Sequence, residues 1–144
     1  MRRTFTLAAL LTAFAFPALA SEVTHFPHPD PALPFAEAVE YNGVLYMSGQ
    51  IATGPDGKIV AGGMAEQARQ TMDNIKAVTE KHGSGMDKII KCTVFLDDMS
   101  QWGDFNTVYV TYFPDGKLPA RSALGADGLA LSALLEVECL AAVN

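Results

Sequence analysis

The sequence predicts an α+β domain in which a mixed sheet carries two helices on one face. Extended and helical runs follow the order β-β-α-β-α-β-β, and apolar residues in the helical runs recur at steps of three and four. The chain has 144 residues, of which 49% are apolar and 18% are charged. The share of apolar residues is enough for one hydrophobic core, and the chain is too short to form two.

The first two strands are predicted to form a hairpin. Residues 35–40 alternate apolar and polar side chains, Asn42-Gly43 follows, and residues 44–51 are mostly apolar. An Asn-Gly pair between two such runs favours a tight hairpin turn. The remaining strands are predicted from their β-branched and aromatic residues at 89–96, 119–124 and 134–143.

Two helices are predicted, one over about 62–81 and one that follows residues 97–100 and continues to Tyr112. In each helix the large apolar residues fall on one face. In the first helix they are Ala68, Met72, Ile75 and Val78. In the second they form an aromatic stripe of Trp102, Phe105, Tyr109 and Tyr112, of which we expect Trp102, Phe105 and Tyr112 to pack in the core.

Several strands are apolar on both faces. Val44 and Tyr46 point one way, and Leu45 and Met47 point the other. Two helices cover only one face of such a sheet, so a monomer would expose a large apolar patch on the other. We therefore predict a homo-oligomer.

The first twenty residues have the layout of a secretory signal peptide. Residues 1–3 are short and basic, residues 5–16 are apolar, and residues 18–20 match an A-x-A cleavage site. The alternative is a buried N-terminal helix or a membrane anchor, but the apolar stretch is short against the ~20 residues of a bilayer span. The pair Arg2-Arg3 is consistent with a twin-arginine signal.

We therefore predict a signal peptide over 1–20, an N-terminal arm over 21–33 and one domain over 34–144, in a periplasmic or secreted protein. Residues 1–20 carry two of the ten basic residues and none of the sixteen acidic ones, so the remaining 124 residues have a net charge of −8. The acidic charge and the lack of a basic stripe argue against a nucleic-acid partner. We expect no stable membrane association after signal cleavage.

Cys92 and Cys139 each lie in an apolar, strand-like run. Two buried free thiols are the expected state, and a disulfide is the alternative, because an exported protein can keep one. His25 and His28 lie in the Pro-rich arm without the further ligands that a closed zinc site needs. We expect a solvated arm there and no metal site.

Two charged residues are candidates for chemistry. Arg121 follows Pro119-Ala120 at the start of a strand, and Glu138 lies within the last apolar strand, two residues after Glu136. A carboxylate in such a run needs a polar partner or a polar cleft. The alternative is an edge strand whose glutamates face water.

Six segments occur in the order and spacing of one known family, at residues 46–51, 67–76, 90–98, 105–109, 119–122 and 135–138. On these segments the chain resembles the RidA/YjgF family of reactive-intermediate deaminases, also called L-PSP-type proteins, from about Pro34 to Val143. The resemblance implies a chorismate-mutase-like α+β fold that forms a homotrimer, with ligand clefts between subunits. It also implies hydrolysis of enamines and imines, such as 2-aminoacrylate, to 2-oxo acids and ammonia, with no metal or organic cofactor.

The resemblance also implies roles for individual residues. Arg121 would hold the substrate carboxylate, because a guanidinium binds a planar carboxylate through two parallel hydrogen bonds. Glu138 would position or activate the attacking water, and partial desolvation would raise its pKa for that role. Ser48 and Gly49 would line the cleft.

Three further substrate-binding positions depart from the family pattern. Phe35 stands where the family often has tyrosine, Tyr109 where it often has an asparagine near the ligand, and Ala123 where it often has cysteine. These departures suggest a differently shaped pocket. The alternative function is a non-catalytic module that binds a small carboxylate in the same cleft, and the ribonuclease activity of older family names is disfavoured by the acidic charge.

Overall fold

A single six-stranded mixed sheet organises residues 22–143, the part of the chain that the computed structural model describes. The predicted signal peptide at 1–20 lies outside the described residues. The strand order is β1-β2-β3-β6-β4-β5, in which only β4 and β5 are parallel neighbours. The strands are β1 (Thr24–Pro27), β2 (Ala36–Tyr41), β3 (Val44–Met47), β4 (Ile89–Leu96), β5 (Ala120–Gly125) and β6 (Leu135–Ala142).

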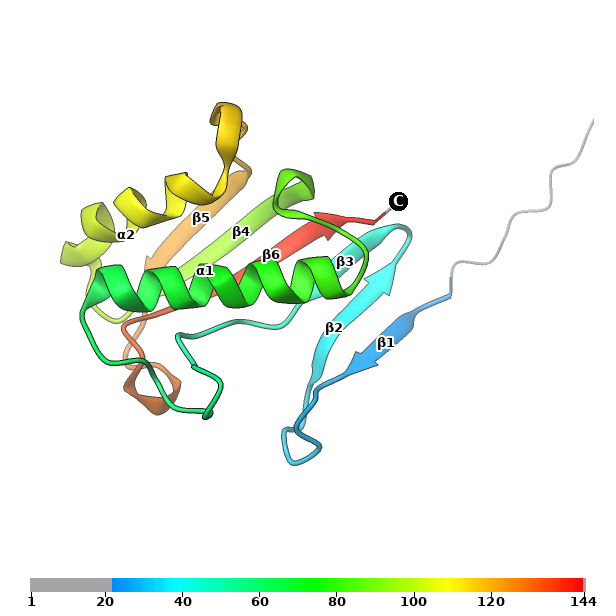
Figure 1. Ribbon diagram of the computed structural model, residues 1–144, viewed down its shortest axis with the longest axis horizontal. Coiled ribbons are helices and arrows are strands. Elements are labelled where there is room, and N and C mark those ends of the chain that lie inside the picture. Colours follow the sequence, from blue (N-terminus) through cyan, green and yellow to red (C-terminus); the bar gives the residue numbers. More distant parts are fainter. Residues whose placement is uncertain (1–21, 144) are drawn as a thin grey trace, which may run out of the picture.

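Two helices, α1 (Met64–Lys81) and α2 (Trp102–Tyr109), pack on the same face of this sheet (Figure 1). The side chain of Glu66 stabilises the start of α1 by accepting a hydrogen bond from the Gly63 N–H at 2.9 Å. The predicted continuation of the second helix to Tyr112 is a 3₁₀ turn over Val110–Tyr112. The α+β prediction, a mixed sheet with two helices on one face, is confirmed. No helix among residues 22–143 is long and apolar enough to cross a membrane.

The strands alternate between the helix-covered face and a face that no other described element covers. In β6, Leu135, Val137 and Cys139 are buried with the helices, whereas Glu136 and Glu138 point to the other side. The same alternation leaves Tyr46 of β3 44% exposed while Leu45 is fully buried. Strand β3 is therefore apolar on both faces, as predicted, whereas β6 presents Glu136 and Glu138 on the uncovered face.

Within the predicted N-terminal arm, residues 24–27 are mostly exposed but pair with β2 as strand β1, which the sequence did not predict. Phe26 opposes Ala38 and Pro27 opposes Ala36, so Glu37 is an extra, bulged residue in β2. The Phe26 ring packs against the His82 ring at 4.1 Å, which fastens β1 to the end of α1.

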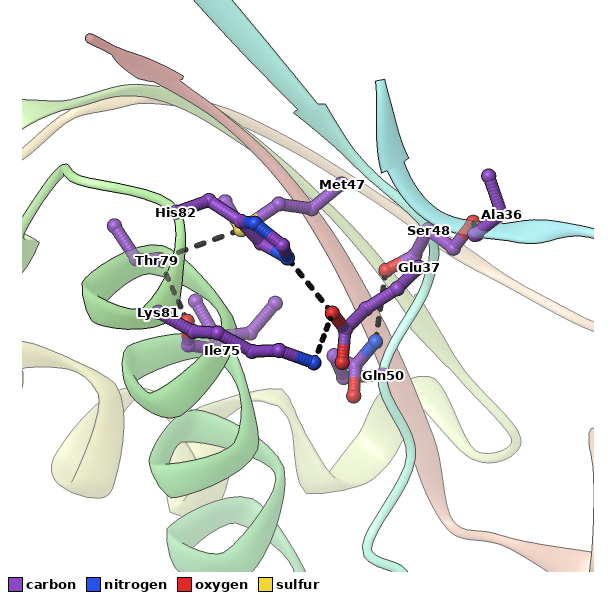
Figure 2. Close-up of polar contacts among 9 residues, drawn as sticks. All are labelled: Ala36, Glu37, Met47, Ser48, Gln50, Ile75, Thr79, Lys81 and His82. Atoms are coloured by element: carbon purple, nitrogen blue, oxygen red, sulfur yellow. Dashed lines mark hydrogen bonds and ion pairs between the residues drawn. The ribbon is translucent and has the colours of Figure 1, made fainter. Parts of the chain in front are cut away.

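The bulge turns the Glu37 side chain toward the end of α1 (Figure 2). One carboxylate oxygen accepts from Lys81 Nζ and lies against His82 Nε2, both at 2.7 Å. Burial alone would raise the pKa of Glu37, but these two basic side chains outweigh it and hold that pKa below its usual range. This cluster was not predicted, because it depends on the bulge.

The expectation of free thiols is wrong. Cys92 of β4 faces Cys139 of β6 in register, with a Cα–Cα distance of 4.1 Å, and the two sulfur atoms form a disulfide. Both side chains are buried beneath the helices. Which strands become neighbours decides this pairing, and their order in the sheet differs from their order in the sequence.

Candidate active site

Arg121 lies near the start of β5, the edge strand beside β4. Its guanidinium carbon lies 4.7 Å from the ring centre of Trp102 and 4.5 Å from that of Tyr109, with Phe105 at 5.7 Å. Among residues 22–143 no carboxylate lies within ion-pair distance of Arg121. The cation is therefore supported by aromatic rings and keeps its charge for another group.

The structure places Tyr109 in the core beneath Arg121, with 2% of its surface exposed. Burial raises the pKa of Tyr109 to about 12, partly opposed by the Arg121 charge, so the phenol stays neutral at physiological pH. Its hydroxyl and the side-chain oxygen of Asn106 are buried with no hydrogen-bond partner in the described chain. Sequence reasoning did not single out Asn106. Ala123, two residues after Arg121, is half-buried against the core.

Glu136 and Glu138 lie on the uncovered face of β6, but they differ in exposure. Glu138 is exposed, whereas Glu136 is half-buried. Burial raises the pKa of Glu136, and the neighbouring Glu138 charge raises it further. The desolvation expected at Glu138 is therefore found at Glu136, and a catalytic role for Glu138 stays a prediction.

The loop of Ser48, Gly49 and Gln50 accounts for the burial of Glu136. The Ser48 hydroxyl donates to the Ala36 carbonyl at 2.6 Å, and Gln50 and Val137 exchange two backbone hydrogen bonds of 2.9 Å. These bonds hold Gly49 against Glu136, whose carboxylate occupies the space that a Cβ on Gly49 would need. Three of the residues considered at the sequence level (Ser48, Gly49 and Glu136) thus meet at one place.

Phe35 lies apart from Arg121, at the end of the loop between β1 and β2. It is 49% exposed and packs edge-on against His28 at 5.3 Å. It lines an open hollow of about 470 Å³, together with Pro27, Pro31, Leu33 and Pro34. Neither this hollow nor a second one of about 340 Å³ between the starts of α1 and α2 is lined by Arg121 or Glu136.

Arg121 and Glu136 lie on opposite faces of the sheet. Arg121 pairs with Cys92, whose side chain is buried on the helix-covered face. Glu136 pairs with Phe95 and alternates with the buried Leu135 and Val137, which places it on the uncovered face. Within one chain the two side chains therefore point away from each other across the sheet.

Residues 27–143 match the family model described as endoribonuclease L-PSP. The chain belongs to this family. A protein named HMF1 from Saccharomyces cerevisiae is 39% identical to this chain over 114 residues. These residues cover 79% of this chain and 88% of that protein. A mouse protein named 2-iminobutanoate/2-iminopropanoate deaminase is 36% identical over 109 residues, covering 75% of this chain and 80% of that protein.

Solved structures of L-PSP relatives share the fold. The yeast Mmf1 structure superposes with a TM-score of 0.79 at 36% identity, covering 85% of this chain and all of that chain. The structure of the YjgF gene product of Escherichia coli gives a TM-score of 0.75 at 31% identity, covering 82% of this chain and 94% of that chain. The resemblance to the RidA/YjgF family is thereby confirmed.

Proposed function

We propose that this protein hydrolyses imines and enamines of the 2-aminoacrylate type to 2-oxo acids and ammonia. The observation that carries the proposal is Arg121, a guanidinium held on aromatic rings with no carboxylate beside it in the described chain. Such a group suits the carboxylate of an amino-acid-derived imine. The name of the mouse relative supports this reaction type.

The chemistry needs a group that moves a proton, and the burial of Glu136 supports assigning that role to it. Water adds to the imine carbon while the Glu136 carboxylate accepts a proton from the water. The proton is then returned to the nitrogen, which gives a carbinolamine. The carboxylate next accepts the proton of the carbinolamine hydroxyl and passes it to the nitrogen, the C–N bond breaks, and the products are a C=O group and ammonia. Burial and the Glu138 charge raise the pKa of Glu136 above its usual value, which suits a carboxyl that accepts and returns a proton.

We propose that the working unit is a homotrimer with Arg121 and Glu136 contributed by neighbouring copies. Their positions on opposite faces support a site shared between chains. The exposed apolar side chains on the uncovered face, with Tyr46 and Leu124 each 44% exposed, support burial against another copy.

The reaction is tested by adding the purified protein to an amino-acid oxidase that releases 2-imino acids. We expect faster formation of 2-oxo acid and ammonia, and no acceleration by Arg121→Ala. Arg69→Ala is the matched control, because in the described residues the Arg69 side chain donates only to the Ala65 carbonyl of its own helix. No acceleration over several imines, or equal loss in both variants, contradicts the proposal.

The shared site is tested by subunit mixing. Arg121→Ala and Glu136→Gln chains are each inactive, and they are unfolded and refolded together in equal amounts. If each site takes Arg121 from one copy and Glu136 from another, about a quarter of wild-type activity returns, since about a quarter of random interfaces carry both groups. A site within one chain returns none.

The alternative function is a module that binds a small carboxylate without turnover. The buried hydroxyl of Tyr109 favours it, since no phenol faces a ligand beside Arg121 in the described chain. Calorimetry would then give 2-oxo acid binding that depends on Arg121, with no release of ammonia from any imine.

We also propose export, with cleavage after Ala20. The basic, apolar and A-x-A pattern supports it, and the buried Cys92–Cys139 disulfide suits an oxidising compartment. N-terminal sequencing of the protein recovered from its own cells should begin at Ser21. A chain that still begins at Met1 overturns this proposal.

A further inference from the structure

Trp102, the first residue of α2, is half-buried and lies over Arg121 rather than wholly inside the core. Its ring centre is 4.7 Å from the guanidinium carbon, and the Tyr109 ring is at 4.5 Å. Trp102 and Tyr109 are seven residues apart, so they share one face of the helix. The helical spacing predicts core packing for Trp102, but in the structure its ring also lies over a cation.

The same protein fixes another basic side chain in a different way. Lys81 donates to the Glu37 carboxylate at 2.7 Å, so that ammonium is neutralised by a partner of its own chain. Among residues 22–143, Arg121 has aromatic neighbours and no carboxylate within ion-pair distance. An aromatic ring attracts a cation through its negative face but, unlike a carboxylate, carries no net charge that neutralises it. The Arg121 charge is thereby held in place and remains able to bind an anion.

We propose that Trp102 is a positioning residue, which holds the Arg121 guanidinium in the orientation that binds a substrate carboxylate. The inference rests on the proposed function, because it takes Arg121 as the carboxylate-binding group. The inference goes beyond the proposed function because it makes the strength of carboxylate binding depend on the neighbouring side chain of Trp102. Loss of the ring face weakens capture of the carboxylate and leaves the bond-breaking steps at Glu136 unchanged.

Trp102 is the only tryptophan in the chain, so fluorinated tryptophan incorporated during expression replaces this ring alone. Fluorine withdraws negative charge from the face of the indole ring with little change in its shape. A series of proteins with one, two or more fluorines on Trp102 should therefore weaken the contact with Arg121 in steps. The probe ligand is 2-oxobutanoate, and its dissociation constant is measured by calorimetry. Steady-state kinetics with a 2-imino acid gives KM and kcat for the same proteins.

We expect the dissociation constant and KM to rise with each added fluorine, reaching about fivefold, while kcat stays within about twofold. Trp102→Phe, which keeps an aromatic face, retains most of the affinity, and Trp102→Leu loses it to the same extent as the most fluorinated protein. Binding of 2-oxobutanoate also changes the fluorescence of Trp102 in the wild type and leaves it unchanged in Arg121→Ala.

Tyr112→Leu is the matched control, because Tyr112 is also a half-buried aromatic residue beside α2 but is not among the described rings that lie over the Arg121 guanidinium. An equal rise in KM in Tyr112→Leu, or affinity that does not change with fluorination, overturns the role of Trp102. If the affinity for 2-oxobutanoate does not change with fluorination but the protein still hydrolyses the 2-imino acid, the proposed function is supported and only the role of Trp102 is wrong. Binding that weakens with fluorination in a protein without turnover supports Trp102 and contradicts the hydrolase. A wild type that neither binds 2-oxobutanoate nor hydrolyses a 2-imino acid overturns both.

Discussion

The carboxylate of Glu136 lies where a side chain on Gly49 would have to be. The two residues come from distant parts of the chain, and the paired backbone bonds of Gln50 and Val137 bring them together. Because Gly49 covers Glu136, the carboxylate loses water and its pKa rises. The close approach of Gly49 therefore contributes to the raised pKa of Glu136.

Gly49→Ala should therefore reduce activity while leaving the fold intact. The added methyl group displaces the end of a flexible side chain, so we expect the free energy of unfolding to change by less than about 1 kcal/mol. We expect kcat/KM to fall by about tenfold or more, since a displaced base no longer reaches its proton. Gly103→Ala is the control, because nothing in the described chain lies within 4 Å of a Cβ there, and it should keep full activity. Equal activity in the two variants would contradict this account.

Glu136→Gln and Glu138→Gln should separate the two glutamates of β6. With Glu136 as the base, Glu136→Gln lowers kcat by about 10²-fold or more. The raised pKa of Glu136 means that kcat/KM falls, with decreasing pH, at a value above the ordinary 4.5 of a glutamic acid. Glu138→Gln removes the neighbouring charge that contributes to this rise, so the acidic limb of its pH profile should move to lower pH. A profile that is unchanged in Glu138→Gln, or full activity in Glu136→Gln, would show that Glu136 is not the base.

Glu37→Gln should destabilise the fold in a pH-dependent way. The folded pKa of Glu37 lies below its ordinary value of 4.5, so the ionised form stabilises the fold above pH 4.5 and this contribution is lost as the pH falls through the folded pKa. Urea unfolding at pH 7 should give a loss of about 2 kcal/mol, the size of a hydrogen bond to a charged group, and a smaller loss at pH 3. Glu80→Gln is the control, because the Glu80–Lys76 pair is exposed at 3.9 Å and is worth about 0.5 kcal/mol or less. Equal losses at both pH values would rule out the charge as the cause.

Reduction of the Cys92–Cys139 disulfide should lower stability without removing the fold. The cysteines are 47 residues apart, and releasing a loop of that length costs up to about 4 kcal/mol in the chain-entropy account. Guanidinium unfolding with and without dithiothreitol measures this difference. The double variant Cys92→Ala/Cys139→Ala should match the reduced protein and be insensitive to the reductant. Identical curves for the oxidised wild type and the double variant would show that the bond contributes nothing.

The elements that could be predicted from the sequence are those with a strong local pattern. Helix α1 has one continuous apolar face, and Asn42-Gly43 marks the turn between β2 and β3. Strand β1 could not be found in this way, because residues 24–27 are mostly exposed and Pro-rich and become a strand only by pairing with β2. The bulge at Glu37 depends on the same pairing.

The candidate site was predicted only in part, because some of its contacts also depend on pairing between distant segments. Arg121 stood out by its position at the start of a strand, and Ser48 and Gly49 by the resemblance to a known family. Glu136 and Glu138 are equivalent by periodicity, and only the loop at Gly49 makes one of them the more buried. The contact of Trp102 with Arg121 joins a helix to an edge strand, which no local pattern reveals.

The bond between Cys92 and Cys139 makes a closed ring of the chain that contains α2, β5 and Arg121. The most exposed large apolar residue of this ring is Leu131, 64% exposed in a turn with a left-handed backbone. A protease that cuts there separates the peptide of Arg121 from that of Glu136. The two peptides nevertheless stay joined through sulfur, so a nicked molecule keeps both halves of its candidate site until a reductant parts them.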